Sequence, residues 1–247
     1  MPVAIITGAS SGIGAALAHE LGRRKWKVGV IARRADLLDT LVAEVRAAGG
    51  EAAAATADVT DRAGLEAAVA ALEATLGACD LLVANAGSGQ PAPMHKIPVE
   101  TILSTMRLNF DGAVYSAAAV LPGMLERKRG HVAVVSSVAA NRGLPGHGAY
   151  SASKAAVSTL WEAMRVDLRG HGIACTTIHP GFVATPLTEK NKFKMPFLLT
   201  AEQAAVIVAD GLEGRVAEIT FPWQMRWVAR LMRALPIWLW DRMAPKR

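Results

Sequence analysis

Short apolar runs recur along the whole chain, and segments with helical periodicity separate them. The runs that read as strands are residues 3–7, 27–32, 51–57, 80–85, 131–136, 172–179 and 215–221. Strands that are apolar at nearly every position are buried on both faces, as in a parallel sheet. Their regular alternation with helices predicts a doubly wound α/β fold, with about seven parallel strands, helices on both faces and right-handed crossovers.

The length of the chain fits one large domain better than two small ones. It has 247 residues, and α/β domains often reach roughly 200–250 residues as one unit. No low-complexity linker and no internal repeat interrupts it. We therefore expect one domain over residues 1–221, followed by a basic and aromatic extension at 222–247 that is part of the same fold or forms a peripheral helix.

Cysteine and histidine usage argues against a disulfide framework or a metal site. Cys79 and Cys175 lie far apart without a C-x-x-C pair, and the six histidines show no ligand spacing. No signal-peptide pattern opens the sequence, and no apolar stretch reaches the ~18 residues of a membrane span. These features predict a cytoplasmic protein without a metal.

The net charge of +6 does not indicate a nucleic-acid partner. The positive residues are spread along the chain until the C-terminal extension, and no zinc-finger or basic-zipper pattern accompanies them. We therefore expect a small-molecule partner and no nucleic acid.

The segment TGASSGIG, residues 7–14, joins the first predicted strand to the first predicted helix. Its glycines permit a tight turn and the close approach of a pyrophosphate, and the helix N-terminus offers unpaired N–H groups and a favourable dipole. An ordinary glycine-rich turn is the alternative, but the place between strand and helix favours a dinucleotide site. The residues assigned to this site are Gly8, Ser10, Ser11, Gly12, Ile13 and Gly14.

The end of the second predicted strand indicates which dinucleotide binds. An acidic residue there binds the ribose 2′-hydroxyl of NAD, whereas a nearby arginine accepts the 2′-phosphate of NADP. Here the strand leads into Arg33 and Arg34, and no acid follows until Asp36. A guanidinium matches a phosphate dianion in charge and in geometry. The sequence favours NADP(H), with Arg33 as the main 2′-phosphate ligand and Arg34 as the weaker candidate; two solvated arginines are the alternative.

Polar and small residues follow the third and fourth predicted strands. Asp58 and Val59 come after the third, and Asn85, Ala86 and Gly87 after the fourth. Open α/β sheets bind ligands at the carboxyl ends of their strands, so these residues join the predicted cofactor site. An aspartate there can accept from an adenine amino group, although Asp58 or Asn85 could instead cap a turn.

Four further polar residues indicate catalysis. Ser137 ends the fifth predicted strand, Tyr150 lies thirteen residues later, Lys154 lies four beyond that, and Asn109 stands upstream in RLNFDG. Residues four apart on a helix share a face, and a nearby ammonium makes a phenol easier to ionise. The Tyr150–Lys154 pair is a candidate proton donor and acceptor; an incidental pair on a helix surface is the alternative.

Together these motifs resemble the short-chain dehydrogenase/reductase family. The resemblance covers residues 3–221 and includes TGxxxGxG, the Asp-Val pair, Asn-Ala-Gly, the central Asn, the S-x12-Y-x3-K spacing and P-G-x-V-x-T at 180–185. It implies a Rossmann-type fold and hydride transfer between a nicotinamide cofactor and a carbonyl or secondary alcohol. A catalytically silent dinucleotide-binding sensor or scaffold is the alternative, and the complete polar set argues against it.

The resemblance also implies a role for each polar residue. Tyr150 would be the general acid/base, and Ser137 would hydrogen-bond the substrate oxygen. Asn109 would orient a water linked to Lys154. Lys154 would bind the nicotinamide ribose and, with the positive charge of the oxidised nicotinamide, favour the phenolate. The segment that passes the nicotinamide would contain Pro180, Gly181, Val183 and Thr185.

The variable substrate loop of the resembling family corresponds to residues 185–203. Several large apolar residues and three lysines stand there, which suggests an apolar or lipid-like substrate; residues that only pack the loop are the alternative.

In the extension 222–247, Arg226, Arg230 and Arg233 fall on one helical face, and Trp227 and Leu231 lie toward the other. Such a helix could lie in a membrane interface. The arrangement we favour is a helix packed over the pocket or against a partner subunit, because amphipathic helices usually pack on protein.

Self-association is expected through the helices around 100–127 and 149–169. They carry small and apolar residues on more than one face, among them Ala117, Ala118, Ala119, Val157 and Trp161. In the resembling family these helices form a symmetric dimer, and closed two-fold pairing is the commonest assembly. We predict a homodimer, with a homotetramer as the alternative.

Overall fold

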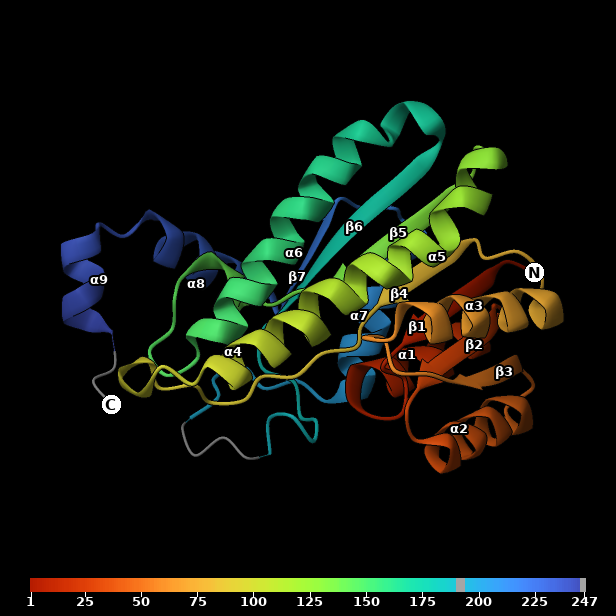
Figure 1. The fold of residues 1–247 in the computed structure, drawn as a ribbon, viewed down its shortest axis with the longest axis horizontal. Helices are drawn as coiled ribbons and strands as arrows, with labels where there is room; N and C mark the ends of the chain where they lie inside the picture. The colour runs from red at the N-terminus through yellow and green to blue at the C-terminus, as the bar shows by residue number, and fades with distance from the viewer. Residues whose placement is uncertain (190–193, 245–247) are drawn as a thin grey trace.

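Seven parallel strands form one sheet in the order β3-β2-β1-β4-β5-β6-β7 in a computed structural model that describes residues 1–189 and 194–244 (Figure 1). The strands are β1 (Val3–Thr7), β2 (Lys27–Ala32), β3 (Glu51–Thr56), β4 (Leu81–Ala84), β5 (Gly130–Val135), β6 (Ile173–Pro180) and β7 (Glu218–Phe221). Each predicted strand has a counterpart, so the predicted doubly wound parallel sheet is confirmed.

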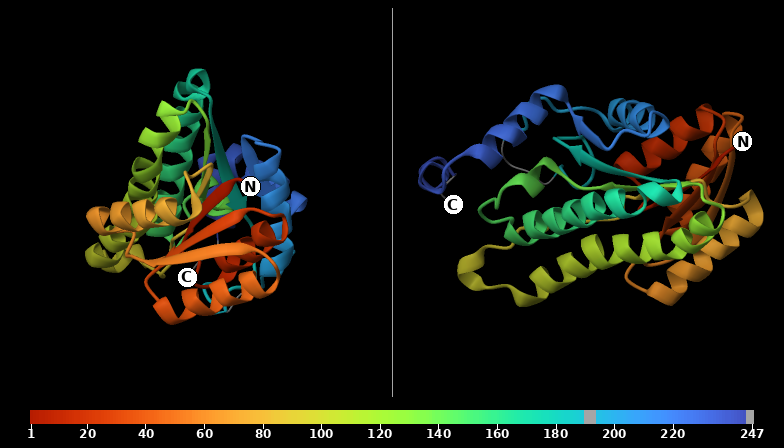
Figure 2. Two further views of the ribbon diagram at one scale, coloured as in Figure 1. Left: turned by 90° about the vertical axis from the view of Figure 1, so that its right-hand side faces the viewer. Right: turned by 90° about the horizontal axis from the view of Figure 1, so that it is seen from above.

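Helices cover both faces of the sheet (Figure 2). One layer contains α1 (Gly12–Arg23), α2 (Ala35–Ala47) and α7 (Ala201–Glu213). The other contains α3 (Arg62–Leu76), α4 (Val99–Met106), α5 (Gly112–Glu126) and α6 (Gly148–Asp167), with a π-helical turn, η2 (Arg107–Asp111), between α4 and α5. Short 3-10 turns are η1 (Met94–Lys96), η3 (Val138–Asn141) and η4 (Arg169–His171). The tail forms α8 (Trp223–Ala234) and α9 (Ile237–Met243).

Each face of the sheet packs against its own hydrophobic cluster. On the α1 side, Leu17 and Leu21 are fully buried against strand residues such as Ile6. On the α6 side, Val157 and Trp161 are fully buried, and the Trp161 indole donates to the Val132 carbonyl over 3.2 Å. The expectation that Ala117, Val157 and Trp161 lie on a dimer face is therefore wrong for these three, because their side chains fill the core.

The strand order reverses beside β1, and this reversal positions the candidate site. Strand β1 pairs with β2 on one side and with β4 on the other, so the chain leaves their carboxyl ends in opposite directions. The crevice outside such a switch point is where open α/β sheets bind ligands. The loops after β1, β2, β4, β5 and β6 all reach this crevice.

The tail packs on the domain along a narrow edge. In α8 only Met225 and Ala229 are buried, and this helix contacts η3 and β7. The Met225 side chain also closes the space above Gly181, where an added Cβ would lie 2.8 Å from Met225 Cγ. Within residues 1–189 and 194–244, no helix is both long enough and apolar enough to cross a bilayer.

Candidate active site

The glycine loop after β1 has the backbone shape that the motif predicts. Gly8 and Gly12 adopt left-handed φ values of +67° and +59°, which disfavour any side chain. An added Cβ at Gly8 would lie 2.6 Å from the Ala86 Cα atom. Ser11 precedes α1 without capping it through its side chain, so the first N–H groups of α1 keep their capacity for a ligand.

Close packing explains why residue 14 is a glycine. An added Cβ there would lie 2.5 Å from Asn85 Nδ2. The same amide donates to the carbonyls of Thr7 and Gly8, over 3.0 and 3.1 Å, and so ties the β1 loop to the β4 loop. Gly14 does not line the pocket, and this close packing is a structural reason for glycine there; its contact with the cofactor stays a prediction.

Two arginines and one aspartate stand at the ends of β2 and β3. The Arg34 guanidinium donates to Ser10 Oγ over 2.7 Å and to Ser11 Oγ over 3.1 Å, which joins β2 to the glycine loop. Arg33 is 72% exposed and lies 3.6 Å from an Asp58 oxygen. The Asp58 carboxylate accepts from the backbone and hydroxyl of Thr60, and these bonds, with the Arg33 charge, lower its pKa. Arg33 has no shorter ion pair among the described residues.

Ser137 lies where β5 ends and η3 begins. Its hydroxyl oxygen accepts from the Ala139 backbone N–H over 3.1 Å, so the hydroxyl proton faces away from that bond and can be donated elsewhere. Behind it, a ring nitrogen of His179 lies 3.3 Å from the Ser137 carbonyl. The preceding residue, Ser136, donates to the Lys154 carbonyl over 2.9 Å and fixes α6 against the end of β5.

Tyr150 and Lys154 lie one turn apart on α6, as their spacing predicts. Lys154 is 4% exposed, and its ammonium donates to the Val135 carbonyl over 2.7 Å. The ammonium nitrogen lies 5.9 Å from the centre of the Tyr150 ring. Gly87 lies between the Lys154 ammonium and the Asn109 amide: an added Cβ at Gly87 would lie 3.2 Å from Lys154 Nζ and 3.0 Å from Asn109 Oδ1.

Burial dominates the ionisation of this pair. It lowers the pKa of Lys154 to about 8 and raises the pKa of Tyr150, whose hydrogen bond with Ser137 opposes the rise. Tyr150 is half-buried and still reaches the pocket. Burial therefore sets the direction of the Tyr150 pKa in the protein alone. The expectation that Lys154 and an oxidised nicotinamide together favour the phenolate concerns the site with cofactor bound and stays a prediction.

Asn109 is buried in the η2 turn and does not line the pocket. Its amide nitrogen donates to the Ser88 carbonyl and to Ser153 Oγ, both over 2.9 Å, and its oxygen accepts from the Ser88 N–H over 2.9 Å. These bonds hold the loop after β4 against α6. The amide nitrogen is thus committed to protein groups, and the contact of Asn109 with a water stays a prediction.

One pocket gathers almost all of the predicted residues. It is lined by Gly8, Ser10, Ser11, Gly12, Ile13, Arg33, Arg34, Asp58, Val59, Asn85, Ala86, Gly87, Ser137, Tyr150, Lys154, Pro180, Gly181, Val183 and Thr185. From the strand order, the pocket runs from the ends of β2 and β3 to the ends of β5 and β6. Gly14 and Asn109 are the predicted residues outside this lining.

Four further lining residues were not predicted: Ala32, Ala57, Leu108 and Val135. Pro186, Leu187 and Thr188 also line the pocket and lie in the predicted substrate loop, and Ser136 lines it at the end of the fifth predicted strand. Most of them directly adjoin predicted residues, so motif spacing was the available signal. The Thr188 hydroxyl donates to the Val183 carbonyl, closing the turn that places Thr185 above Gly12. Of the predicted substrate loop 185–203, residues 190–193 lie outside the described residues, as do tail residues 245–247.

The pocket fits a dinucleotide. At Gly8 and Gly12 a side chain would collide with neighbouring atoms, so only glycine keeps the loop open to a ligand. The N–H groups at the N-terminus of α1 are uncapped and can bind a pyrophosphate. The guanidinium groups of Arg33 and Arg34 line the same pocket at the end of the neighbouring strand β2. A hydroxyl, a phenol and an ammonium meet at the opposite end. The fold and the pocket therefore define a dinucleotide-binding oxidoreductase of the doubly wound α/β class.

The chain belongs to the short chain dehydrogenase family, whose model matches residues 2–195. An uncharacterized oxidoreductase of Myxococcus xanthus is 44% identical over 241 residues, covering 98% of this chain and 95% of that protein. A short-chain dehydrogenase/reductase of Burkholderia phymatum in complex with NAD is similar, with a TM-score of 0.86 and 26% identity over 93% of this chain and 92% of that one. An alcohol dehydrogenase of Thermococcus sibiricus with 5-hydroxy-NADP has a TM-score of 0.82 and 26% identity, covering 90% and 96%.

Proposed function

We propose that this protein is an NADP(H)-dependent oxidoreductase that interconverts a carbonyl group and a secondary alcohol on an apolar substrate. One observation carries the proposal: Ser137, Tyr150 and Lys154 line one end of a pocket whose other end holds Arg33 and Arg34. A proton donor and a site for a phosphorylated dinucleotide thus belong to one cavity. The bound nicotinamide would supply or accept the hydride.

The protein side chains would bind the substrate oxygen and transfer a proton to or from it. In the reductive direction, the Ser137 hydroxyl donates a hydrogen bond to the carbonyl oxygen and holds it beside Tyr150. The Tyr150 hydroxyl gives its proton to that oxygen as the carbon accepts the hydride, which leaves an alcohol and a phenolate. The raised pKa of Tyr150 keeps the phenol protonated at neutral pH, as a donor must be. Lys154 stabilises the phenolate through its positive charge and would bind the cofactor ribose.

The preference for NADP(H) rests on the two arginines. Arg33 is largely exposed and only loosely paired, so its guanidinium has donors available for a 2′-phosphate. Arg34 already bonds Ser10 and Ser11, which places a second positive charge at the edge of the glycine loop. The carboxylate nearest to them, Asp58, is occupied by Thr60 and Arg33. Two cations at this place favour a phosphate over a ribose hydroxyl.

The apolar substrate is supported by the segment after β6. Leu187 lines the pocket, and Phe197 and Leu198 are exposed close to it in sequence. Backbone hydrogen bonds join Leu199 to Phe182 and Ala184, which returns the end of this loop to the pocket wall. An apolar wall at the pocket mouth stabilises alkyl groups by roughly 0.8 kcal/mol for each buried CH₂.

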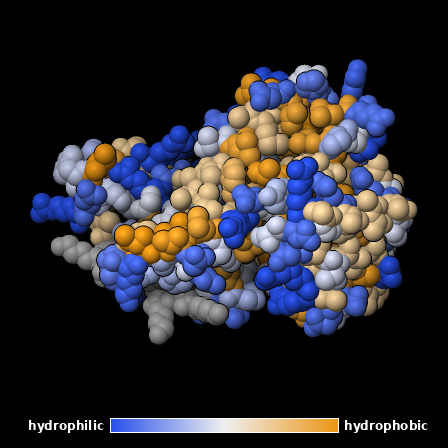
Figure 3. Space-filling model, viewed as in Figure 1, coloured by the Kyte–Doolittle hydropathy of each residue, from blue (hydrophilic) through white to orange (hydrophobic). Residues whose placement is uncertain are grey.

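We also propose a homodimer through the outer face of α6 and its neighbour α5. Ala152, Thr159, Ala163 and Val166 are exposed on α6, with small side chains that permit close approach of a second copy. Ala118 and Ala119 are partly exposed on α5. In the space-filling view an apolar area covers this part of the molecule (Figure 3).

The test of the function is oxidation of NADPH by the purified protein with a series of methyl ketones of increasing chain length. We expect kcat/KM to rise about fourfold for each added CH₂ until the pocket is filled, the rate equivalent of 0.8 kcal/mol. Product analysis should show one alcohol per NADPH consumed. If NADPH binds but no ketone or alcohol in the series is converted, the catalytic assignment is overturned in favour of a binding role.

A further inference from the structure

The tail helix α8 leaves its largest apolar side chains uncovered. Trp223, Trp227 and Leu231 occupy positions i, i+4 and i+8 and are 69%, 62% and 63% exposed. They form one continuous stripe, separate from the edge at Met225 and Ala229 through which the helix packs. Tryptophan is costly to leave in water, so such a stripe marks an interaction surface.

Arginines run beside this stripe. Arg226, Arg230 and Arg233 are all exposed, and the Arg230 guanidinium lies 5.3 Å from the centre of the Trp227 ring. In the described part of the tail, four arginines stand against a single acid, Asp241. Within residues 1–189 and 194–244, none of these arginines forms an ion pair with the domain. The apolar stripe and its basic border therefore face solvent together.

The second tail helix continues this surface. Ile237 is 74% exposed and Trp238 is 68% exposed, whereas Trp240 is partly covered. Trp240 is held by Arg142, whose guanidinium lies 5.4 Å from the centre of the ring. Arg142 belongs to the loop between Ser137 and Tyr150. The exposed tail is thus anchored to the segment that connects the two candidate catalytic residues.

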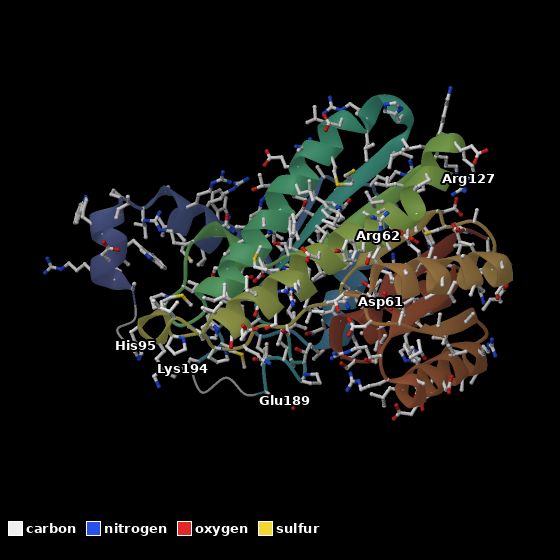
Figure 4. All side chains as sticks on the ribbon, viewed as in Figure 1. Asp61, Arg62, His95, Arg127, Glu189 and Lys194 are labelled. Carbon is white, nitrogen blue, oxygen red and sulfur yellow. The ribbon has the colours of Figure 1, made fainter. Side chains whose placement is uncertain are left out.

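The tail lies at the end of the molecule opposite the N-terminus, on the side of α4 (Figures 1 and 2). Toward the same end, the η1 turn exposes Ile97, and the loop after β6 exposes Phe197. In the side-chain view, His95 of η1 and Lys194 of that loop lie toward this end, whereas Arg127 lies at the other (Figure 4). The space-filling view shows an apolar patch around α4 with the hydrophilic groups of the tail nearby (Figure 3).

We propose that α8 and α9 dock the protein on an anionic lipid bilayer, with the exposed residues Ile97 and Phe197 toward the same surface. The argument is charge complementarity: tryptophans with an arginine border suit the boundary between headgroups and acyl chains, and the arginines select anionic headgroups. A second copy of this chain would instead bring four tail arginines toward the same four arginines of its partner, and this repulsion opposes a symmetric pairing. The proposal concerns attachment and stands apart from the reaction, because its readout needs no substrate.

That symmetric pairing would place Arg226, Arg230, Arg233 and Arg242 of each copy near the same surface. Like charges brought together repel, and each described tail adds only one acid, Asp241, to its four arginines. A bilayer that contains anionic lipid supplies the missing negative charge and at the same time a dry phase for Trp223, Trp227 and Trp238. Each arginine near such a surface strengthens binding by about fivefold at low salt.

Vesicle co-sedimentation of the full chain tests the proposal. We expect the protein to pellet with phosphatidylcholine vesicles that contain phosphatidylglycerol, to bind pure phosphatidylcholine weakly, and to be released by added salt. Four of the six tryptophans lie in the tail, so its fluorescence should shift to shorter wavelength on binding. Arg233→Glu should weaken pelleting at least fivefold, and Trp227→Ser should reduce both pelleting and the fluorescence shift.

Matched variants at the other end of the molecule serve as controls. Arg169→Glu changes the same charge on an exposed residue of η4, and Val206→Ser removes an exposed apolar side chain from α7. Both should pellet like the parent protein, and thermal unfolding should show that all four variants are folded. The proposal would be overturned if the protein did not pellet at low salt, or if tail and control variants lost pelleting equally. It would also be overturned if the light-scattering mass fell to that of a monomer only in Trp227→Ser, which would assign this face to a second copy.

Discussion

The Lys154 ammonium donates to the Val135 carbonyl over 2.7 Å, and so ties α6 to the last residue of β5. The backbone of Lys154 is held from the same side, because Ser136 Oγ donates to the Lys154 carbonyl. Two bonds to adjacent residues of one strand end thus fix the lysine. Since a lysine ammonium has three donors, two remain for the cofactor ribose and for solvent.

Substitution of Tyr150 by phenylalanine should remove the proton donor and keep the ring. We expect turnover to fall by about 100-fold or more, because general acid catalysis contributes roughly that much. Binding of NADPH, measured by the change in its fluorescence, should be nearly unchanged because Lys154 and the glycine loop are intact. A Tyr150→Phe enzyme with near wild-type turnover on a confirmed substrate would contradict the role assigned to the phenol.

Substitution of Arg33 by alanine should weaken NADPH and spare NADH. A charge-assisted hydrogen bond to the 2′-phosphate contributes about 1.5–3 kcal/mol, or roughly 10-fold to 150-fold in Kd. Arg34→Ala should also loosen the glycine loop, because Arg34 bonds Ser10 and Ser11, and so should weaken both cofactors. Dissociation constants of each variant for both cofactors distinguish the two roles. Equal losses of NADPH and NADH affinity in Arg33→Ala would show that this residue does not read the phosphate.

The buried His131 should make the fold sensitive to acid. Burial lowers its pKa to about 4, and its ring nitrogen lies 2.8 Å from Thr176 Oγ1, whose proton goes to the Val216 carbonyl. Between about pH 4 and pH 6.5 the unfolded chain binds a proton here that the folded chain does not. The free energy of unfolding should therefore fall as the pH drops through this window, by up to about 3 kcal/mol.

His131→Gln should remove much of this acid dependence, because its amide can still donate to Thr176 and does not titrate. Denaturant unfolding at pH 7 and pH 4.5 measures the difference. His171→Gln is the matched control, since His171 is exposed in η4. An acid dependence that is the same in His131→Gln, His171→Gln and the parent protein would place its origin elsewhere, for example at the partly buried His179.

Light scattering at micromolar concentration should give the mass of a dimer. If the outer face of α6 forms the contact, Ala163→Glu should yield a monomer, because a buried carboxylate would face its own copy across a two-fold axis. The side chain is exposed in one chain, so the variant should fold normally. A parent protein that is monomeric under these conditions would exclude the dimer.

Sequence pattern located the strands and most of the pocket because their causes are local. An apolar strand followed by a glycine turn and a helix places Gly8 and Gly12 without knowledge of the rest of the chain. The Tyr150–Lys154 spacing works for the same reason, since a helix brings residues four apart together. The strand order then gathers these local features at one edge of the sheet.

The features that could not be predicted from the sequence depend on long-range packing. Asn109 is polar and central, but its bonds go to Ser88 and Ser153, which only the folded chain brings near. The burial of Trp161 against β5, and the desolvation that raises the pKa of Tyr150, have the same origin. In the tail, helical periodicity separated arginines from tryptophans, but it could not show that packing would use the narrow edge at Met225 and Ala229.

All residues that line the pocket lie between Gly8 and Thr188, whereas α7, β7 and the tail come afterwards. The pocket lining and the exposed tail surface therefore lie in separate parts of the sequence. Substitutions of exposed tail residues such as Trp227 and Arg233 change the outer face of α8, whereas Met225 packs against Gly181 and links the tail to the pocket lining. The exposed face of α8 is therefore free to vary in sequence while its inner edge, at Met225 and Ala229, is constrained by the fold.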